Sequence, residues 1–584
     1  MTEAMTGHRL RNVDGPRSAA HHLLQALCDV GIDYVFANLG TDHAPIIEEM
    51  ARWRAEGREG PRVLLCPHES TAAHMAMGYA VATGRGQGVL VHVDVGTTNA
   101  ATAMHNACRS RLPVLLMAGK APYTSHGELP GTRDNYVHFI QEPQDQGSVV
   151  RPYVKWEYTL QSAVHVGEVL RRAHTVMQSG ARGPVYLMLP REALTGQADG
   201  AELPVFPASK HGEMVPGGLP DAPLRDLARR LLEAERPLII ASYAGHTPGT
   251  SEAIERLSEL VGAAVVQNAM VSNINHEMPC FAGGLPGERL PDADVGLIVD
   301  SDVPWIPSAG RPDPSAFWAH VDVDALKTGS PIWSFPADLR LEGSSAQIVG
   351  RLAELVEEMR SADQAERAAA RVAELSAAGD KRRASAAEAA ADPGAPDALN
   401  PHHVLRALGQ ALRSEDVIFH EAVRNQPVMV RQIPRSLPGT MTRTAGGGLG
   451  ASGGMALGYK LARPDRLVVQ IVGDGAFYYN NPASMLAVSR QYDLPTLTVV
   501  LDNAGWSAVK ESTLRCYPDG AAKADGDFAS DFRSDTDYAA IAAMFGFEGV
   551  TLRDPDTVAE QVNRAVDTVR GGKSVVMHVR LPRH

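Results

Sequence analysis

Short apolar runs alternate with helical patterns through the first third of the chain. Between residues 18 and 30, apolar side chains recur at helical spacing, with Ser18 as a suitable cap and Gly31 as a suitable end. Runs rich in Val, Leu and Ile follow, and each predicts a buried strand: 34–36, 63–66, 89–93, 114–117 and 185–189. Apolar strands that alternate with helices are typical of a parallel sheet covered by helices on both faces. We therefore expect residues 16–195 to form one α/β domain.

The same alternation returns in two later blocks. The predicted strands are 238–241, 264–266, 297–300 and 317–322 in the second block, and 467–472, 496–501 and 574–579 in the third. An Ala-, Glu- and Arg-rich segment between these blocks favours a solvent-exposed helix, which Pro393 and Gly394 would end. The sequence therefore predicts an α/β fold class with three doubly wound parallel-sheet domains at 16–195, 205–360 and 399–584, and a helical linker at 361–398.

Length and charge narrow the possible functions only slightly. The 584 residues fit three or four domains of about 150 residues each. The 55 Lys and Arg residues are outnumbered by 68 Asp and Glu residues, and the net charge of −13 argues against a nucleic-acid partner, which needs a basic face. The N-terminal segment is polar and no apolar run reaches the roughly 20 residues that span a bilayer, so we expect no membrane partner and a cytoplasmic location. Five scattered cysteines, none in C-x-x-C spacing, indicate neither a disulfide framework nor a zinc site.

The most informative segment joins two predicted strands of the third block. The strand at 467–472 leads into Gly473-Asp474-Gly475, and the strand at 496–501 is followed closely by Asn503. In a right-handed βαβ unit the carboxyl ends of the two strands are neighbours, so we expect Asp474 and Asn503 to face one crevice. A carboxylate, an amide oxygen and a nearby backbone carbonyl suit Mg²⁺, and the glycines let the backbone approach a diphosphate. Asp and Gly also favour simple turns, so the triplet alone does not establish a site.

A second glycine-rich segment precedes this one. Residues 448–453 fit the dinucleotide fingerprint G-x-G-x-x-G, which would indicate a nicotinamide oxidoreductase. The residues before it, 438–443, are polar rather than a buried strand, and no acidic strand end follows about 20 residues later. We therefore interpret it as a chance match.

Several segments together resemble one enzyme superfamily. Gly-Asp-Gly at 473–475, followed by Asn503, resembles the thiamine diphosphate motif of the acetolactate synthase, pyruvate decarboxylase and benzoylformate decarboxylase superfamily. Residues 67–80 resemble its His-Glu-x-x-Ala-x-x-Met-Ala-x-Gly-Tyr-Ala segment, and 96–99 are similar to its Gly-x-x-Asn turn. Residues 447–450 and 460–466 are similar to the stretch that leads into the metal motif. The resemblance covers nearly the whole chain and is greatest to acetolactate synthase large subunits.

This resemblance implies how the organic part of the cofactor would be held. Glu69 would hydrogen-bond to N1′ of the aminopyrimidine and activate the cofactor. Leu449 would be wedged between the two cofactor rings, and the carbonyl of Gly447 would accept from the 4′-amino group. A lone leucine among glycines is not the pattern of an ordinary core element, which supports this role.

The resemblance also implies the rest of the binding site. Asp474, Asn503 and the carbonyl of Gly505 would hold Mg²⁺, and the amides of Gly475 and Ala476 would bind the diphosphate. Further cofactor-binding residues would be Asn99, Gly473, and two residues expected in a loop, Glu421 and Asn425. The site would form between the first domain of one subunit and the third domain of another, in a homodimer or homotetramer.

The acceptor side of the site leaves the reaction open. Residues 132–142 resemble the acetolactate synthase segment that ends in Phe-Gln-Glu, which makes His138, Phe139 and Gln141 candidates for contact with an acceptor. Against this, residues 506–515 lack the tryptophan that acetolactate synthases carry near Ser512 and offer Lys510, which a solvent-exposed helix would also explain. The adjacent histidine pair of pyruvate decarboxylases is absent too, which makes a simple pyruvate decarboxylase a weaker interpretation.

The leading hypothesis is decarboxylation of a 2-oxo acid with carboligation to a second carbonyl, an aldehyde or a ketone, as in acetolactate synthase. One alternative is a non-oxidative 2-oxo acid decarboxylase, or a related C–C lyase, that releases an aldehyde. An alternative of another class is a non-catalytic regulatory paralogue that keeps the fold, although the intact Glu69, Asp474 and Asn503 argue against it. The implied cofactors are thiamine diphosphate and Mg²⁺. FAD, which acetolactate synthases hold in the central domain, stays open because no motif decides it.

Overall fold

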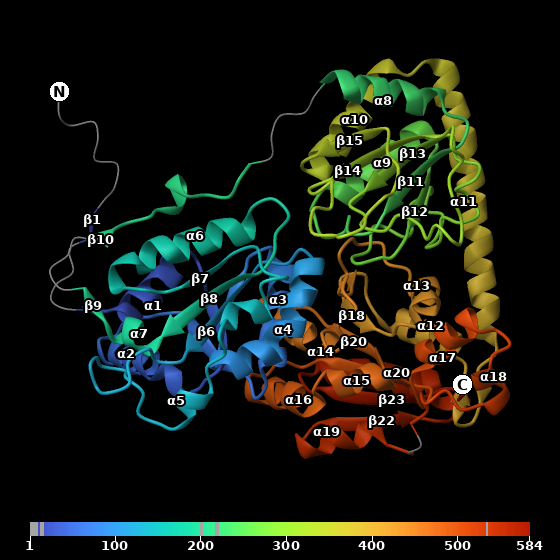
Figure 1. Ribbon diagram of the computed structural model, residues 1–584. Helices are drawn as coiled ribbons and strands as arrows, with labels where there is room; N and C mark the ends of the chain where they lie inside the picture. The colour runs from blue at the N-terminus through green and yellow to red at the C-terminus, as the bar shows by residue number, and fades with distance from the viewer. Residues whose placement is uncertain (1–9, 12–16, 199–202, 216–220, 533–534, 584) are drawn as a thin grey trace, which may run out of the picture. The chain divides into compact units, whose positions relative to one another are not determined.

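Three parallel sheets form the framework of the chain (Figure 1). The computed structural model describes residues 10–11, 17–198, 203–215, 221–532 and 535–583. The chain divides into two compact units, one of Met1–Val215, Thr444–Asp465 and Tyr479–Leu494, and one of Pro216–Arg443, Arg466–Tyr478 and Pro495–His584. All three sheets are parallel throughout, which confirms the predicted α/β fold class.

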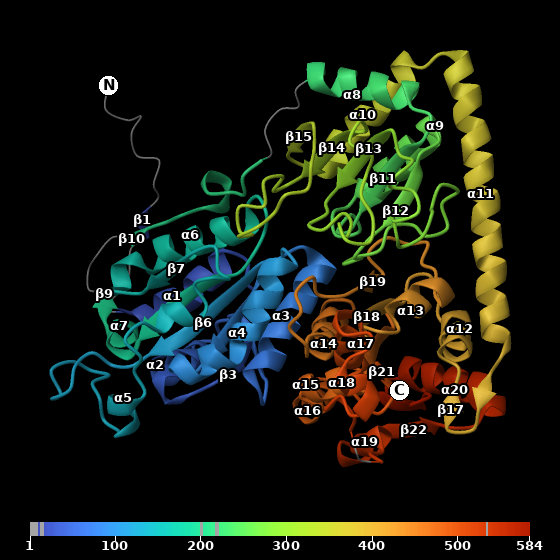
Figure 2. The same cartoon turned by 45° about the vertical axis from the view of Figure 1, so that its right-hand side comes forward.

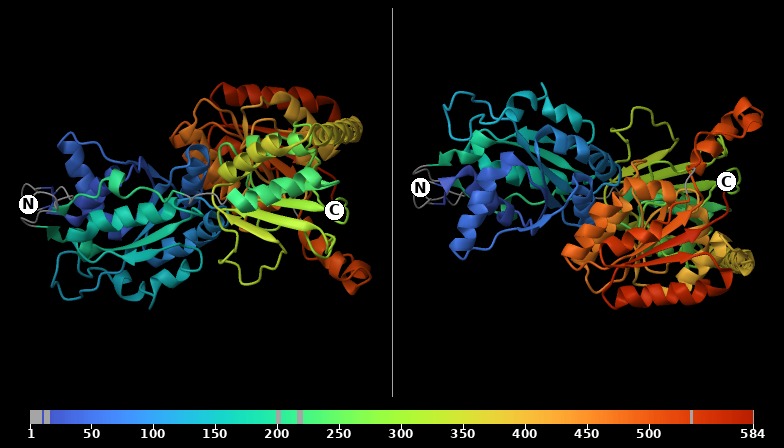
Figure 3. Two further views of the ribbon diagram at one scale, coloured as in Figure 1. Left: turned by 90° about the horizontal axis from the view of Figure 1, so that it is seen from above. Right: turned by 90° about the horizontal axis from the view of Figure 1, so that it is seen from below.

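The first sheet belongs to the first unit and has the strand order β4-β3-β5-β6-β8-β7, with helices on both faces (Figures 1 and 3). Its strands are β3 (Tyr34–Asn38), β4 (Arg62–Leu65), β5 (Gln87–Val91), β6 (Val114–Lys120), β7 (Glu157–Thr159) and β8 (Val185–Pro190). The helices are α1 (Ala19–Asp29), η1 (Thr41–His43), α2 (Ala44–Ala55), α3 (Glu69–Thr83), α4 (Val93–Arg109), α5 (Val137–Ile140), α6 (Val166–Gln178) and α7 (Arg191–Thr195). Two short antiparallel pairs, β1 (Leu10–Arg11) with β10 (Leu203–Pro204) and β2 (Arg17–Ser18) with β9 (Gln197–Ala198), accompany it.

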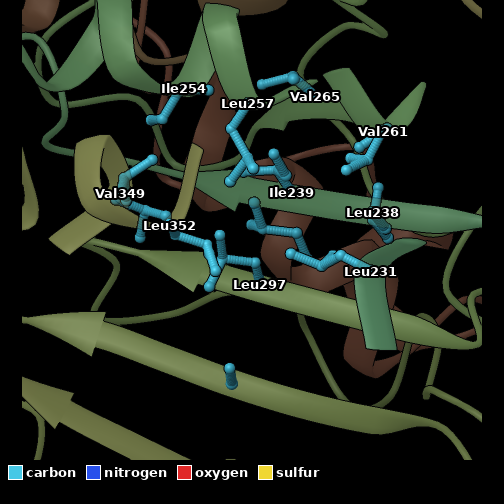
Figure 4. Packing of buried hydrophobic residues seen from close by; sticks show 14 of the residues in the cluster. Leu231, Leu238, Ile239, Ile254, Leu257, Val261, Val265, Leu297, Val349 and Leu352 are labelled. Carbon is cyan, nitrogen blue, oxygen red and sulfur yellow. The ribbon is translucent and has the colours of Figure 1, made fainter. Parts of the chain in front are cut away.

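The central sheet belongs to the second unit and has the order β12-β11-β13-β14-β15. Its strands are β11 (Pro237–Ala241), β12 (Ala264–Gln267), β13 (Val295–Val299), β14 (Phe317–Asp322) and β15 (Leu339–Glu342), and its helices are α8 (Asp221–Glu233), α9 (Thr250–Val261) and α10 (Ser345–Met359). Apolar side chains of β11, α9 and α10, among them Ile239, Leu257 and Leu352, gather in one buried cluster (Figure 4). Each such side chain contributes about 1.5–3 kcal/mol by leaving water, so this cluster fixes the helices on the sheet.

A 30-residue helix, α11 (Ala362–Ala391), follows the central sheet and packs on α9 and α12 (Figure 2). Ser361 and Gln364 cap its first turn reciprocally, since the serine hydroxyl accepts from the Gln364 amide and the glutamine side chain accepts from the Ser361 amide. The helix ends at Asp392, and a small hairpin of β16 (Gly394–Ala395) and β17 (Ala398–Leu399) follows. The Ala-rich segment is therefore helical, as its composition favours.

The third sheet has the order β19-β18-β20-β21-β23-β22. Its strands are β18 (Val417–Glu421), β19 (Met441–Thr442), β20 (Val468–Gly473), β21 (Leu497–Asp502), β22 (Glu548–Leu552) and β23 (Val575–Arg580). The helices of this part of the chain are α12 (Pro401–Ala411), α13 (Gln426–Gln432), α14 (Ser452–Ala462), α15 (Asp474–Tyr479), α16 (Pro482–Gln491), α17 (Ser507–Cys516), α18 (Ala521–Asp525), α19 (Ile541–Met544) and α20 (Val558–Arg570). The first and third sheets have the same strand permutation, although their sequences show no repeat.

Helices α3 and α14 of the first unit cross in backbone contact. A Cβ added to Gly78 of α3 would lie 1.9 Å from the carbonyl oxygen of Met455, and one added to Gly458 of α14 would lie 1.9 Å from that of Met75. Glycine is required at both positions because any side chain would drive the two backbones apart. The contact fixes the residues at the start of each helix relative to one another.

Two local predictions are wrong. The predicted turn at 96–99 lies inside α4, because Gly96 lets the helix pack on β5: a Cβ there would come within 3.0 Å of Val91. The predicted strand at 89–93 ends at Val91, so His92 is instead the N-cap of α4. Among the described strands of the three large sheets, five were not predicted from the sequence: β7, β15, β18, β19 and β22.

Candidate functional site

The carboxyl ends of β20 and β21 bring two predicted residues to one edge of the third sheet. These strands are parallel neighbours, Asp474 begins α15 directly after β20, and Asn503 directly follows β21. One carboxylate oxygen of Asp474 accepts from the Gly475 amide at 2.9 Å, and the other accepts from the Gly505 amide at 2.8 Å. The Oδ1 atom of Asn503 is buried and has no hydrogen-bond partner among the described residues. The strand-end arrangement expected from the sequence is therefore present.

Within the described residues, no cationic side chain is paired with the carboxylate of Asp474. Burial, aided by the negative charge of the neighbouring Asp502, raises the pKa of Asp474. Burial also tends to raise the pKa of Asp502. Hydrogen bonds from His578 at 2.8 Å and Arg580 at 3.0 Å outweigh this effect, so the pKa of Asp502 is lowered. His578 and Arg580 therefore serve Asp502. Asp474 and Asn503 together offer two buried oxygens to a cation, and the described residues contain no cluster of three His, Cys, Asp or Glu side chains that would offer another site.

The glycines around Asp474 differ in what surrounds them. A Cβ on Gly475 would come within 2.4 Å of the Trp506 indole, and one on Gly505 within 2.3 Å of the Ser530 carbonyl oxygen. A Cβ on Gly473 would meet nothing within 4 Å. Gly475 and Gly505 are thus needed for close packing, whereas open space lies beside Gly473, and Ala476 is buried in the first turn of α15.

Two further predicted residues belong to the same sheet. Glu421, expected in a loop, is instead the last residue of β18, where it pairs in register with Val472 of β20. Asn425 is the N-cap of α13, and both residues are almost completely buried. Glu421, Asp474 and Asn503 thus come from the carboxyl ends of three consecutive strands of one sheet, which is where open α/β sheets bind ligands.

In the first unit, Glu69 is the first residue of α3 and is buried. The amide nitrogen of Asn99 donates to its carboxylate at 3.1 Å. Asn99 comes from α4, so two predicted residues that are 30 positions apart are brought together by the packing of α3 on α4. A buried carboxylate at a helix N-terminus with one amide partner keeps further lone pairs for a ligand.

The loop before α14 carries Gly447 and Leu449. A Cβ on Gly447 would meet nothing within 4 Å, and Leu449 is only half-buried, so both have open space beside them. Gly450 has a φ of +101°, a conformation that favours glycine, and a Cβ there would lie 2.2 Å from the Tyr479 carbonyl oxygen. The glycines shape this loop, and Leu449 is the residue whose side chain it displays.

The three predicted acceptor-side residues lie in α5 or directly after it. His138 is buried, its Nδ1 atom lies 3.2 Å from the Asp134 carboxylate, and burial, together with the charge of Arg191, lowers its pKa. Gln141 follows α5, and its side chain is one of the groups that raise the pKa of His92. Phe139 is exposed, beneath the guanidinium of Arg133 at 5.3 Å.

A buried ion pair at the carboxyl ends of β3 and β5 was missed by sequence reasoning. Asp42 of η1 and the Nδ1 atom of His92 are 2.5 Å apart, and the second oxygen of Asp42 accepts from the Val93 amide at 3.1 Å. The hydrogen bond to Asp42 raises the pKa of His92. A Cβ on Gly119 of β6 would lie 1.4 Å from Asp42, so glycine there makes room for the carboxylate. The signal in the sequence that could have indicated this pair is a polar residue, His92, at the end of an apolar run.

Comparisons with known proteins agree with this arrangement. Residues 17–149 match the family described as "Thiamine pyrophosphate enzyme, N-terminal TPP binding domain", and residues 425–579 match "Thiamine pyrophosphate enzyme, C-terminal TPP binding domain". The chain is 22% identical to the acetolactate synthase large subunit of Lactococcus lactis, over 94% of this chain and 91% of that protein. It is 27% identical to sulfoacetaldehyde acetyltransferase of Rhodobacter capsulatus (94% and 91% covered) and 26% identical to benzoylformate decarboxylase of Pseudomonas aeruginosa (82% and 85% covered).

Solved structures show the same fold. A thiamine diphosphate-dependent 4-hydroxybenzoylformate decarboxylase of Rhodococcus jostii RHA1 superimposes with a TM-score of 0.76 at 20% identity, covering 97% of this chain and all 100% of that one. Within the described residues, no helix has the length and apolar character needed to cross a membrane. The N-terminal match contains Glu69 and Asn99, and the C-terminal match contains Asp474 and Asn503. On this evidence, the chain is an enzyme of the thiamine pyrophosphate enzyme family.

Proposed function

We propose that the protein uses thiamine diphosphate and Mg²⁺ to decarboxylate a 2-oxo acid and to join the remaining acyl group to a second carbonyl, an aldehyde or a ketone. The names of its relatives support this class, since they include acetolactate synthases, an acetyltransferase and 2-oxo acid decarboxylases. The observation that supports the metal-dependent site most strongly is the buried Oδ1 of Asn503, which has no hydrogen-bond partner in the part of the chain that the structure describes. A buried amide oxygen without a partner costs about 1–3 kcal/mol, so a ligand that binds it repays that cost.

In this proposal Asp474, Asn503 and the carbonyl of Gly505 hold Mg²⁺. The amides of Gly475 and Ala476 bind the diphosphate, with Glu421, Asn425 and Gly473 around it. Mg²⁺ suits these residues because it prefers oxygen ligands and also keeps phosphate oxygens in its shell. The Asp474 carboxylate accepts from backbone amides, whereas that of Asp502 is held by His578 and Arg580, so Asp474 is the carboxylate available to a cation.

Glu69, Gly447 and Leu449 hold the organic part of the cofactor. The carboxyl group of Glu69 hydrogen-bonds to N1′ of the aminopyrimidine, and the Asn99 amide keeps that carboxyl group in place. The Gly447 carbonyl accepts from the 4′-amino group, and Leu449 fills the angle between the rings. When bound, the cofactor supplies an electron sink that allows the bond next to the ketone carbon of a 2-oxo acid to break. The protein orients the reacting groups and positions the proton donors and acceptors.

The acceptor side is formed by Gln141 and His138. The Gln141 side chain helps to raise the pKa of His92 in the Asp42–His92 pair, whereas buried His138 contacts Asp134 and Arg191. A decarboxylase that releases an aldehyde uses the same residues without an acceptor. A panel of 2-oxo acids, followed for CO₂ release and for products with and without added aldehydes, separates the two reactions.

The central sheet does not fit a flavin. At the carboxyl ends of β11 and β13, the hydroxyl of Tyr243 donates to Asp302 at 2.6 Å, and the Lys327 ammonium lies 2.7 Å from Asp302 and 2.6 Å from Asp322. Tyr243 and Lys327 are both buried, so the chain's own side chains occupy the crevice where a dinucleotide would enter. The carboxylates there would also repel a diphosphate. We therefore leave FAD out of the proposed function.

Glu69 provides the test of the proposal. Glu69→Gln keeps the size of the side chain but cannot hold N1′ as an acid, so it should lower turnover by about 100-fold or more. Glu252→Gln, also in the first turn of a helix but exposed on α9, is the matched control and should keep full activity. Turnover by Glu69→Gln close to that of the unaltered protein would refute the assignment.

We also propose that the enzyme is a homodimer or homotetramer whose sites are shared between subunits, as the resemblance implies. If sites are shared, mixing and refolding Glu69→Gln with Asn503→Ala creates hybrids with one intact site, and activity returns. If each site is built from a single chain, the mixture stays inactive. Light scattering after size-exclusion chromatography measures the number of subunits.

A further inference from the structure

Helix α4 displays one stripe of polar side chains that reaches two parts of the candidate cofactor site. Asn99 and Asn106 are seven residues apart, which is two helical turns, so they lie on one face about 10 Å apart along the axis. Asn99 donates to the carboxylate of Glu69 at 3.1 Å. Asn106 donates to the carbonyl oxygen of Gly448 at 2.9 Å, and Ser110, at the end of the same stripe, accepts from the amide of Ala445 at 3.0 Å. One helix face thus contacts both Glu69 and the loop that carries Gly447 and Leu449.

The loop lies directly on α4 without any gap. A Cβ added to Gly448 would come within 2.7 Å of both the Asn106 Oδ1 atom and the Thr102 Cγ2 atom, and one added to Gly446 would come within 2.6 Å of the His105 ring. Neither glycine has a positive φ. These glycines are therefore explained by close approach to α4 rather than by an unusual backbone conformation.

The orientation of Asn106 is fixed from the opposite side by His74 of α3. Asn106 and His74 are completely buried, and the amide nitrogen of Asn106 lies 3.2 Å from the His74 Nε2 atom. Burial lowers the pKa of His74 to about 4, so its ring is neutral at physiological pH. A neutral ring that accepts at Nε2 carries its proton on Nδ1, which lies 3.2 Å from the Ser70 hydroxyl. Both neighbours of the Asn106 nitrogen are then acceptors, so only the NH₂ group fits between them.

We propose that Asn106 is a positioning residue of the cofactor site, which fixes the peptide of Gly448, and with it Gly447 and Leu449, against α4. This inference rests on the proposed function, in which this loop binds the cofactor. The Oδ1 atom of Asn106 is buried without a partner among the described residues. The protein therefore tolerates an unsatisfied oxygen in order to keep the two bonds of the nitrogen.

Two variants test this inference, one in the helix and one in the loop. Asn106→Leu keeps a similar volume but removes the donor, and Gly448→Ala pushes the loop away from α4 without altering the helix. Asn563→Ala is the matched control, because the Asn563 amide also donates to a backbone carbonyl, that of Ala559 at 2.8 Å, but on the exposed face of α20. Cofactor-free protein is titrated with thiamine diphosphate at saturating Mg²⁺, and amide hydrogen exchange of the peptide covering 444–451 is measured by mass spectrometry.

Both altered proteins should bind thiamine diphosphate about fivefold to tenfold more weakly, the effect of about one hydrogen bond, and should exchange the 444–451 amides faster in the absence of cofactor. At saturating cofactor the KM for the 2-oxo acid should stay unchanged, because Asn106 does not face the substrate. Cofactor affinity and exchange like those of Asn563→Ala would overturn the inference. If one variant fails to fold, the other gives the same two measurements. Absence of thiamine diphosphate binding by the unaltered protein would instead overturn the proposed function.

Discussion

Asn503 allows the metal-site assignment to be tested by a change that should not harm the metal-free protein. Its Oδ1 atom is buried and has no partner within residues 221–532 or the other described ranges, so the metal-free fold bears a cost of about 1–3 kcal/mol for it. Asn503→Ala removes this buried oxygen, which stabilises the metal-free protein, but it also removes some side-chain packing, which destabilises it. We therefore expect the melting temperature of metal-free Asn503→Ala to equal or exceed that of the unaltered protein.

The same substitution should abolish stabilisation by the ligands. At a ligand concentration of 100 times Kd, binding contributes about 2.7 kcal/mol, which corresponds to a rise in melting temperature of roughly 5–10 °C. Thiamine diphosphate with Mg²⁺ should raise the melting temperature of the unaltered protein by that amount and leave Asn503→Ala almost unchanged. Scanning fluorimetry of protein dialysed against EDTA, with and without both ligands, measures the two effects.

Asn480 is the matched control for this experiment. It is also a buried asparagine, but its Oδ1 atom accepts from the Gly453 amide at 2.7 Å. Asn480→Ala should therefore lower the stability of the metal-free protein by about 2 kcal/mol. The reasoning is refuted if Asn503→Ala melts several degrees lower than the unaltered protein without ligands and still responds fully to thiamine diphosphate and Mg²⁺.

Three further outcomes are expected. Chelation of divalent cations by EDTA should weaken thiamine diphosphate binding by about tenfold or more, and calorimetry after adding Mg²⁺ should show the affinity restored. Asp42→Asn should destabilise the protein by about 2 kcal/mol near pH 6. The Asp42–His92 pair stabilises the protein fully only below the ordinary His92 pKa of 6.5, and this stabilisation fades as the pH rises through the raised pKa of His92 in the folded protein. A loss of stability that stays constant from pH 6 to pH 9 would contradict this. Gly458→Ala should cost about 3 kcal/mol through its clash with the Met75 carbonyl, whereas Gly350→Ala, with nothing within 4 Å, should be neutral or stabilising in urea titrations.

The sequence predicted the buried centre of each sheet better than its edges. Central strands such as β5 and β21 are fully buried on both faces and therefore appear as continuous apolar runs. The edge strands β15 and β22 mix exposed and buried positions, and β7 is half-buried throughout, so none of them appears as a continuous apolar run. The buried strand β18 was hidden because it ends in His420 and Glu421.

The contacts of the candidate site also fall into those that the sequence predicted and those that it did not. Asp474 and Asn503 follow neighbouring strands of one βαβ unit, so local topology was enough to bring them together. The Asp42–His92 pair joins residues 50 positions apart, and the bond from Asn106 to Gly448 joins residues 342 positions apart. Such contacts depend on the strand order and on how α14 packs against α3, and no local pattern contains that information.

The crossing of α3 with α14 has a consequence for how the chain is made. Helix α3 has small and apolar residues on every side, and its glycine-lined face is covered by a helix that begins at Ser452. At about 5–20 residues per second, a ribosome needs roughly 20–75 seconds to pass from one helix to the other. During this interval a newly made α3 exposes a surface that can bind the wrong partner. Production of this protein should therefore depend more on chaperones and on a low expression temperature than its stability once folded would suggest.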